Sequence, residues 1–64
     1  MATVRIAKAT VIQQGTVGNL IRADGFTIYC APERATEAIQ LLDKGWRVEA
    51  HLDHKGNVDG IAGV

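Results

Sequence analysis

Several residue types are missing or scarce in this 64-residue sequence, and each absence excludes a class of protein. There is no serine, which excludes catalysis by a serine nucleophile. Cys30 is the only cysteine, so no disulfide can form within the chain, and a lone thiol on an apolar strand is typical of a reducing compartment. No apolar run approaches the roughly 20 residues that a membrane-spanning helix needs.

Charge of one sign is not in excess either, since seven basic residues balance seven acidic ones. This balance removes the simplest indication of nucleic-acid binding, an overall positive charge, but it is compatible with a local basic patch. Arg5 and Lys8 interrupt the short apolar runs at the N-terminus, so this segment lacks the hydrophobic stretch of a signal peptide. We therefore expect a cytoplasmic protein that binds no membrane.

The chain has the length of one small domain, residues 1–64, with little room for a core. A domain of about this size buries only roughly 60% of the surface that its unfolded chain exposes. Small domains often make up the missing stability with disulfides, a metal or self-association. With a single cysteine in the chain, self-association is one way for this protein to gain that stability.

The first half of the sequence predicts three strands, because it is rich in the β-branched and apolar residues that suit a pleated surface. The alternation slips between Lys8 and Val11, which indicates a bulge in the first strand. Asp24-Gly25 is the signal of a tight hairpin between the second strand and the third. The predicted strands are residues 3–13, 19–23 and 26–30.

The second half predicts a helix followed by two strands. Pro32 suits the first turn of a helix, and Gly45 is typical of a helix C-terminal cap. Between them one apolar stripe has helical spacing and consists of Ala35, Ala38, Ile39 and Leu42. Strict alternation then predicts a strand whose core side carries Trp46, Val48, Ala50 and Leu52, and residues 58–64 form the last strand.

The predicted order is therefore strand, strand, strand, helix, strand, strand. A helix with one narrow apolar stripe can seal an open end of a curled five-stranded sheet, and curling removes the exposed edges of the sheet. We expect a mainly β protein with one helix, whose sheet forms a small five-stranded barrel. The alternatives are an SH3-like barrel and an open sheet with the helix on one face.

This layout resembles the OB-fold, the small barrel of cold-shock domains, the smallest bacterial initiation factor and many single-strand binders. In that fold the helix commonly sits between the third and fourth strands. The closing segment KGWRVEAHLDHKGNVDGIAGV has the glycine, apolar and turn spacing of its last hairpin. The sequence departs from cold-shock domains in lacking their paired aromatic runs. The resemblance implies an OB-like barrel with a ligand surface on the outer face of its second and third strands.

Single-stranded DNA or RNA is the favoured ligand. If Phe26 faces the core, Tyr29 faces outward, and the same alternation turns Arg5 and Arg22 outward, with Arg47 at the margin of this face. Guanidinium groups bind phosphates, and an exposed ring can stack on a base. The competing interpretation is a merely solvated sheet surface on which the arginines pair with acids. We predict a non-enzymatic binding module for nucleic acid or nucleoprotein.

A protein-binding adaptor or inhibitor is the alternative function, and it includes a homo-oligomer. Leu20 has outward parity on its strand, and Leu41 lies about 110° from the centre of the helix stripe at 100° per residue. With Ile61 they would form an apolar patch for a partner or for a second copy of the chain. The competing interpretation is that the leucines cover the ends of the barrel.

Metal chemistry and catalysis have the weakest indications. His51 and Asp53 share a strand face, but His54 points the other way, and a structural zinc site needs four ligands. The sequence has no cofactor motif and no signature of an activated thiol around Cys30. We expect no metal, no cofactor and no enzyme activity.

Overall fold

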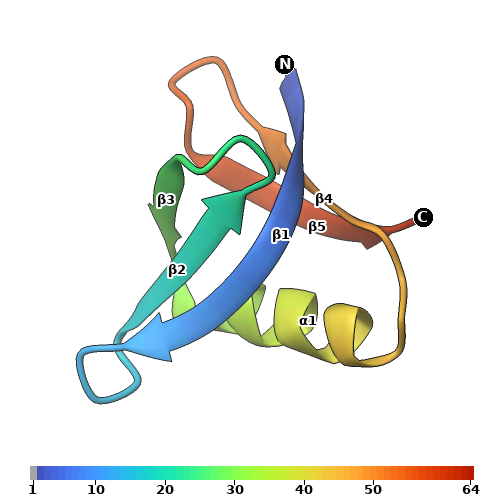
Figure 1. Ribbon diagram of the computed structural model, residues 1–64. Coiled ribbons are helices and arrows are strands. Elements are labelled where there is room, and N and C mark those ends of the chain that lie inside the picture. The colour runs from blue at the N-terminus through green and yellow to red at the C-terminus, as the bar shows by residue number, and fades with distance from the viewer. Residues whose placement is uncertain (1) are drawn as a thin grey trace.

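The computed structural model of the protein describes residues 2–64, which form one five-stranded sheet and one helix (Figure 1). The elements follow one another in the predicted order, so the expectation of a mainly β fold with one helix is confirmed. Their bounds are β1 Ala2–Ile12, β2 Val17–Arg22, β3 Thr27–Cys30, α1 Pro32–Asp43, β4 Val48–Leu52 and β5 Val58–Gly63.

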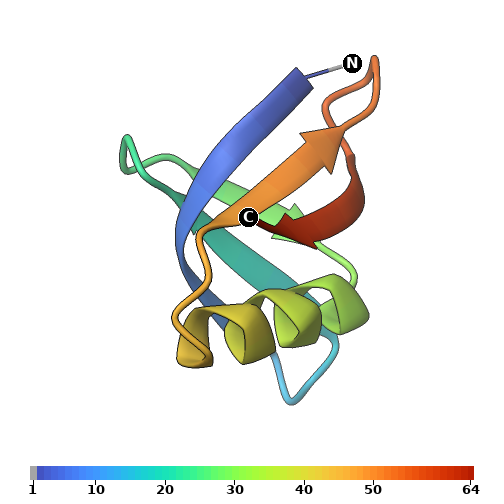
Figure 2. The same ribbon diagram turned by 90° about the vertical axis from the view of Figure 1, so that its right-hand side faces the viewer.

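Strand β1 is the centre of the sheet, whose order is β3-β2-β1-β4-β5 with antiparallel neighbours throughout. The first half of β1, from Ala2 to Ile6, pairs with β4, and the second half, from Ile6 to Ile12, pairs with β2. The register with β2 shifts between Ile6 and Lys8, a bulge just before the predicted position. The bulge lies where β1 leaves one neighbour for the other, and β1 is strongly curved (Figures 1 and 2).

The sheet is curled but not closed into a barrel. Within residues 2–64 its outer strands, β3 and β5, are not paired with each other, so the predicted barrel is not confirmed. Four antiparallel steps separate these two strands, which therefore run in the same direction and could pair only as parallel strands, the slightly less stable arrangement. Helix α1 packs on β1, β2 and β5 and covers one end of the curled sheet (Figure 2).

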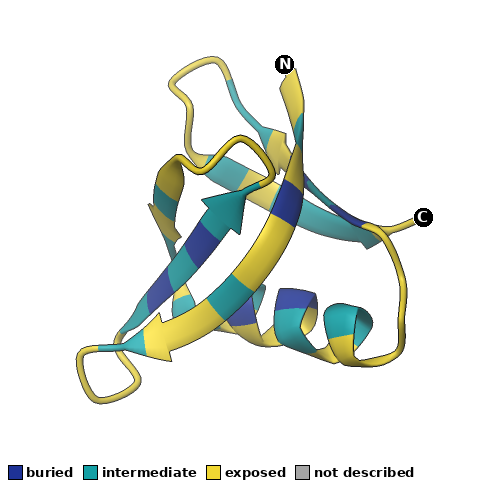
Figure 3. Cartoon of the chain, in the orientation of Figure 1, coloured by how far each residue is buried: buried dark blue, intermediate teal, exposed yellow. Residues whose placement is uncertain are grey.

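The core lies between α1 and the side of the sheet that it covers (Figure 3). Ala35 and Ala38 of the predicted helix stripe are fully buried there, which confirms the orientation of the helix. The small alanine side chains let the helix approach the sheet closely. Within residues 2–64 the buried residues are all aliphatic and consist of Ile6, Leu20, Ala35, Ala38, Val48 and Ala50.

Gly18 on β2 permits the close contact between the sheet and the start of α1. A β-carbon at this position would lie 2.7 Å from the carbonyl oxygen of Ala31 and 2.9 Å from the β-carbon of Ala35. Atoms in proteins do not pack this closely without displacement, and interiors are too dense to absorb it freely. The position therefore requires glycine.

The outward orientation predicted for two residues of β2, Leu20 and Arg22, is wrong. Leu20 is 0% exposed and stands opposite Ile28 of β3 on the side that α1 covers. Arg22 has the same parity as Leu20 and stands opposite the buried Ile6. Because Leu20 and Ile21 are adjacent and both apolar, the alternation along β2 allows either of them to face the core. The register with β1 decides between them, and it is not readable from the sequence of β2 alone.

Candidate nucleic-acid interface

Arg5 lies on β1 at the place where both neighbouring strands end. Strand β2 ends at Arg22 and β4 begins at Val48, and both residues stand opposite Ile6. Beyond the end of β2 the chain stays close, because the Ala23 backbone N–H donates a hydrogen bond of 3.0 Å to the Arg5 carbonyl oxygen. The connections at these two strand ends, rather than the strands themselves, therefore form the surface beside Arg5.

Two adjoining open depressions occupy this part of the surface and share Arg5 and Ala23. The first also contains Arg22, and the second also contains Trp46 and Arg47 from the connection between α1 and β4. The structure thus brings together three of the four residues predicted for nucleic-acid binding. The first depression is lined by Thr3, Val4, Arg5, Arg22, Ala23 and Asp24, and the second by Arg5, Ile6, Ala7, Ala23, Leu42, Trp46, Arg47 and Val48.

Arg22 contacts two residues of the β2–β3 hairpin. Its Nη2 donates a hydrogen bond of 2.8 Å to Oδ2 of Asp24, and its guanidinium carbon lies 5.7 Å from the centre of the Phe26 ring. The second distance is within the range of a cation–π contact. The ion pair is partly exposed, so it contributes at most about 1 kcal/mol, and a phosphate can compete with Asp24 for the guanidinium group.

The other two arginines are not engaged by carboxylates. Ion pairs within residues 2–64 involve only Arg22 and Arg34, so the guanidinium groups of Arg5 and Arg47 are available to a ligand. Glu49 stands opposite Arg5 in the β1–β4 ladder. Asp24, which pairs with Arg22, is the second acid near these residues. Two acids beside three arginines leave a small local excess of positive charge.

Trp46 is exposed, although strand alternation predicts it on the core side of β4. The residue is 51% exposed and lies three residues beyond the end of α1 at Asp43. The Trp46 N–H donates a hydrogen bond of 3.1 Å to the Leu41 carbonyl oxygen, and the Gly45 N–H donates one of 3.0 Å to that of Leu42. With Gly45 at a φ of 85°, these bonds form a Schellman motif, which fixes Trp46 before the strand begins at Val48.

Phe26 is also exposed, at 68%, where a core position is predicted. It follows a three-residue turn in which the Gly25 N–H donates a hydrogen bond of 2.9 Å to the Arg22 carbonyl oxygen. The Arg22 N–H in turn donates one of 2.8 Å to the Phe26 carbonyl oxygen. This turn lies at the end of the sheet away from α1 (Figure 1), so the helix does not cover the Phe26 ring, although Phe26 has the same parity as Ile28, which packs against the core.

Tyr29 is 65% exposed, as predicted, but it lies apart from the arginines. It stands opposite Asn19 on β2, which places it on the other side of the sheet from Arg22, and it lines neither depression. The expected common face of Arg5, Arg22 and Tyr29 is therefore wrong. Nucleic-acid binding by any of these residues stays a prediction.

The residues of the predicted protein-binding patch do not form an exposed surface. Leu20 is in the core, and Leu41 and Ile61 are half-buried and packed against the core. Leu41 also approaches the backbone of β5, with its Cδ2 3.0 Å from where a β-carbon of Gly63 would lie. The apolar side chains of this patch therefore stabilise the fold of the single chain.

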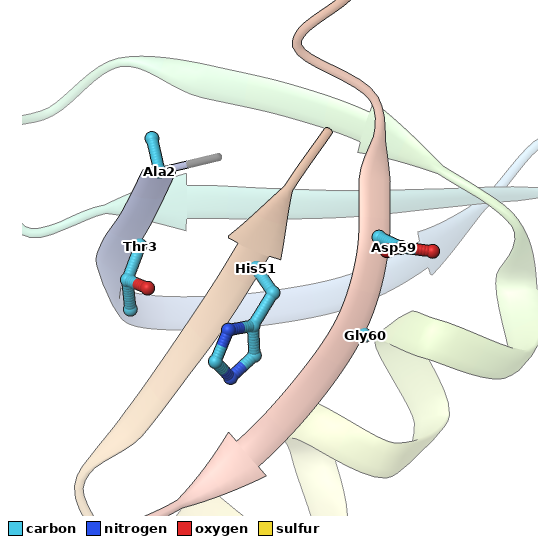
Figure 4. A pocket seen from close by; sticks show the side chains of 5 residues that line it. All are labelled: Ala2, Thr3, His51, Asp59 and Gly60. Atoms are coloured by element: carbon cyan, nitrogen blue, oxygen red, sulfur yellow. The ribbon is translucent and has the colours of Figure 1, made fainter. Parts of the chain in front are cut away.

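His51, Asp53 and His54 are not gathered into a metal site. No group of three or more histidine, cysteine, aspartate or glutamate side chains lies together within residues 2–64. Oδ1 of Asp53 accepts hydrogen bonds of 2.9 Å from the backbone N–H groups of Lys55 and Asn57, so this carboxylate stabilises the β4–β5 turn. His51 lines an open depression in which its ring points away from the side chain of Asp59 (Figure 4).

The thiol of Cys30 is half-buried beside the start of α1. Burial raises the pKa of this thiol, and this effect outweighs the lowering by a hydrogen bond from the Ala35 backbone and by the charge of Arg34. A raised pKa keeps the thiol protonated at neutral pH, whereas the thiolate is the nucleophilic form.

No protein-family model, curated protein or solved structure matches this chain. Within residues 2–64, no helical segment has the length and apolar character that crossing a bilayer would require.

Proposed function

We propose that the protein binds single-stranded nucleic acid through Arg5, Arg22, Phe26, Trp46 and Arg47, named here the arginine surface. One observation carries this proposal. Three of the four arginines in the chain line two adjoining depressions, with Trp46 in one depression and the Phe26 ring against the arginine of the other. Both rings are more than half exposed.

The side chains of the arginine surface match the phosphate and the base of a nucleotide. Guanidinium groups donate paired hydrogen bonds to phosphate oxygens, and aromatic rings stack on the faces of bases. Stacking on a protein ring requires a base that is free of its own stack, which favours a single strand over a duplex. The neutral overall charge means that attraction comes from this local group of arginines rather than from the whole molecule.

The proposal includes an OB-like interpretation of the fold. The element order, the helix between the third and fourth strands, and the position of β1 between β2 and β4 are compatible with that fold. OB-folds commonly bind single strands on the face of their second and third strands, where this protein carries Tyr29. The arginine surface lies instead across β1 and the ends of β2 and β4, so the two locations can be separated by mutation.

The expected affinity is modest and dependent on salt. Three phosphate contacts on a single strand give a slope near −2 in a plot of log affinity against log salt concentration. Raising the salt concentration fourfold should therefore weaken binding by about tenfold or somewhat more. Each base that stacks on a ring adds roughly 1–3 kcal/mol.

The fluorescence of Trp46, the only tryptophan, provides a direct test in the unmodified protein. We expect a single-stranded 12-mer of mixed sequence, as DNA or as RNA, to quench this emission at low salt, with quenching reversed by added salt. The same sequence annealed as a duplex should quench much less. Unchanged emission at low salt, even at high oligonucleotide concentration, would contradict binding at the arginine surface.

Matched variants locate the site. Arg5→Ala and Arg47→Ala should each weaken binding of a labelled 12-mer by about five- to tenfold and lower the steepness of its salt dependence. Arg34→Ala removes the same charge from α1, where Arg34 pairs with Glu37 at 3.0 Å and lines neither depression, and should leave binding unchanged. Equal losses for all three variants would indicate nonspecific attraction and would overturn the proposed site.

A further inference from the structure

Strand β5 forms one edge of the sheet, and α1 packs against it near Gly63, but the strand itself carries few of the residues that prevent edges from pairing. Natural edge strands are commonly protected by lysine, proline, inward-pointing charges or a covering element. Within β5, Val58–Gly63, the only charged residue is Asp59, at the start of the strand, and no proline or lysine is present. The other edge, β3, has only four residues. Strand β5 is therefore the longer and less protected edge.

The ladder between β4 and β5 shows which backbone groups of β5 point away from the sheet. Arg47 and Val64 exchange both of their backbone hydrogen bonds, at 3.3 and 2.7 Å. Hydrogen-bonded pairs alternate along an antiparallel ladder, so Ala62, opposite Glu49, also directs its N–H and C=O toward β4. The intervening residues, Ile61 and Gly63, direct theirs outward, and no partner for them exists within residues 2–64.

From this arrangement we infer that two copies of the chain associate by antiparallel pairing of their β5 strands around a two-fold axis. With the axis at Ala62, Ile61 of each copy stands opposite Gly63 of the other. Four hydrogen bonds, two in each Ile61–Gly63 pair, then satisfy all four outward N–H groups and all four outward C=O groups of these residues. The two Ala62 side chains meet at the axis, where their small size permits close approach.

Only this register, with its axis at Ala62, pairs the outward groups of Ile61 with those of Gly63 and leaves out Asp59, where the ladder with β4 is irregular. The association joins the two sheets into one continuous sheet of ten strands and gives a closed dimer, because the same edge is used on both sides. A small domain with few buried side chains gains stability from such pairing. The interface uses one strand of each copy, so it is small and the dimer is weak.

The unmodified protein tests the inference in two ways. Sedimentation should give a mass that rises from 6.9 kDa toward twice this value as the concentration increases. Amide hydrogen exchange at high concentration should slow specifically at Ile61 and Gly63, while the amide of Ala62 is slow at every concentration because it is already paired with β4. A mass of 6.9 kDa at all concentrations up to the millimolar range would overturn the inference.

Variants that place a charge at the two-fold axis give the decisive test. Ala62→Lys and Ala62→Glu each place two like charges opposite each other, and each should weaken self-association by about tenfold or more. An equimolar mixture of the two variants should recover association, because opposite charges then meet. As a control, Thr3→Lys and Thr3→Glu place the same charges at an exposed position of β1 and should leave the mass unchanged. A dimer that Ala62→Lys and Ala62→Glu both leave intact would show that β5 is not the contact.

Discussion

The core and the arginine surface of this protein are built from different kinds of side chain. In the described part of the chain, residues 2–64, the buried residues are three alanines and three larger aliphatic residues. In contrast, Phe26, Tyr29 and Trp46, which are all the aromatic residues of the sequence, are exposed. An aromatic ring buries 150–250 Å² and would contribute more to a small core than any alanine. A sequence that leaves its rings outside departs from the arrangement best for stability, and such departures are expected at functional sites.

The largest expected effect is on the free energy of unfolding, and it distinguishes a substitution at Leu20 from one at Trp46. Leu20→Ala removes a fully buried side chain and should lower the free energy of unfolding by about 2–4 kcal/mol, measured by urea denaturation. Trp46→Ala should lower the free energy of unfolding by less than about 1 kcal/mol, because roughly half of the residue is exposed and its removal leaves no closed cavity. Equal destabilisation by the two variants would make Trp46 a member of the core and remove the contrast.

Gly18→Ala tests how closely the core is packed. The new methyl group would collide with the Ala31 carbonyl oxygen and the Ala35 side chain, both on or next to α1. We expect a loss of about 1–3 kcal/mol in the free energy of unfolding. Gly60→Ala on β5 is the matched control, since a β-carbon there meets no atom within 4 Å, and it should cost less than about 0.5 kcal/mol.

Much of the fold was predictable from the sequence because its signals are local. Pro32 and Gly45 mark the two ends of the helix region, and the apolar stripe sets the face of α1 that packs on the sheet. The side of β2 that faces the core was not predictable, because it depends on the register with β1 and on the bulge after Ile6. Closure of the sheet depends on β3 and β5, which are distant in sequence, and no local pattern encodes it.

The candidate site was predictable only in part, for the same reason. Alternation correctly indicates an exposed Tyr29, but it places Trp46 and Phe26 on the core side because it treats residues of a helix cap and of a turn as strand residues. Gly45 immediately before Trp46 is the one available signal that the ring belongs to a cap. The grouping of Arg5 with Arg47 depends on where neighbouring strands end.

The β1–β2 turn provides a region that belongs neither to the core nor to the arginine surface. Gln13 and Gln14 have φ values of 52° and 58°, in the left-handed region that glycine adopts more readily than residues with side chains. Gln14→Gly should therefore raise the free energy of unfolding by about 0.5–1 kcal/mol and leave oligonucleotide binding unchanged. Altered binding in this variant would extend the ligand contact beyond the arginine surface.

The smallest expected effect concerns the pH dependence of stability. Because burial raises the pKa of the Cys30 thiol above its ordinary value of 9.0, the folded state favours the protonated form. The contribution of the protonated Cys30 thiol to the stability of the folded state is fully present below pH 9, and it decreases as the pH rises through the folded-state pKa. Unfolding midpoints measured at pH 8 and pH 10 should therefore differ more for the natural protein than for Cys30→Val. The same difference in both proteins would show that Cys30 does not contribute.

The most direct test of the arginine surface is a nuclear magnetic resonance titration of the natural protein with a single-stranded 12-mer at low salt. We expect the largest backbone amide shifts in residues 3–7, 22–26 and 46–48, and their disappearance when salt is raised. Shifts concentrated around Tyr29 on β3, with the amides beside Arg5 and Arg47 unchanged, would contradict the account.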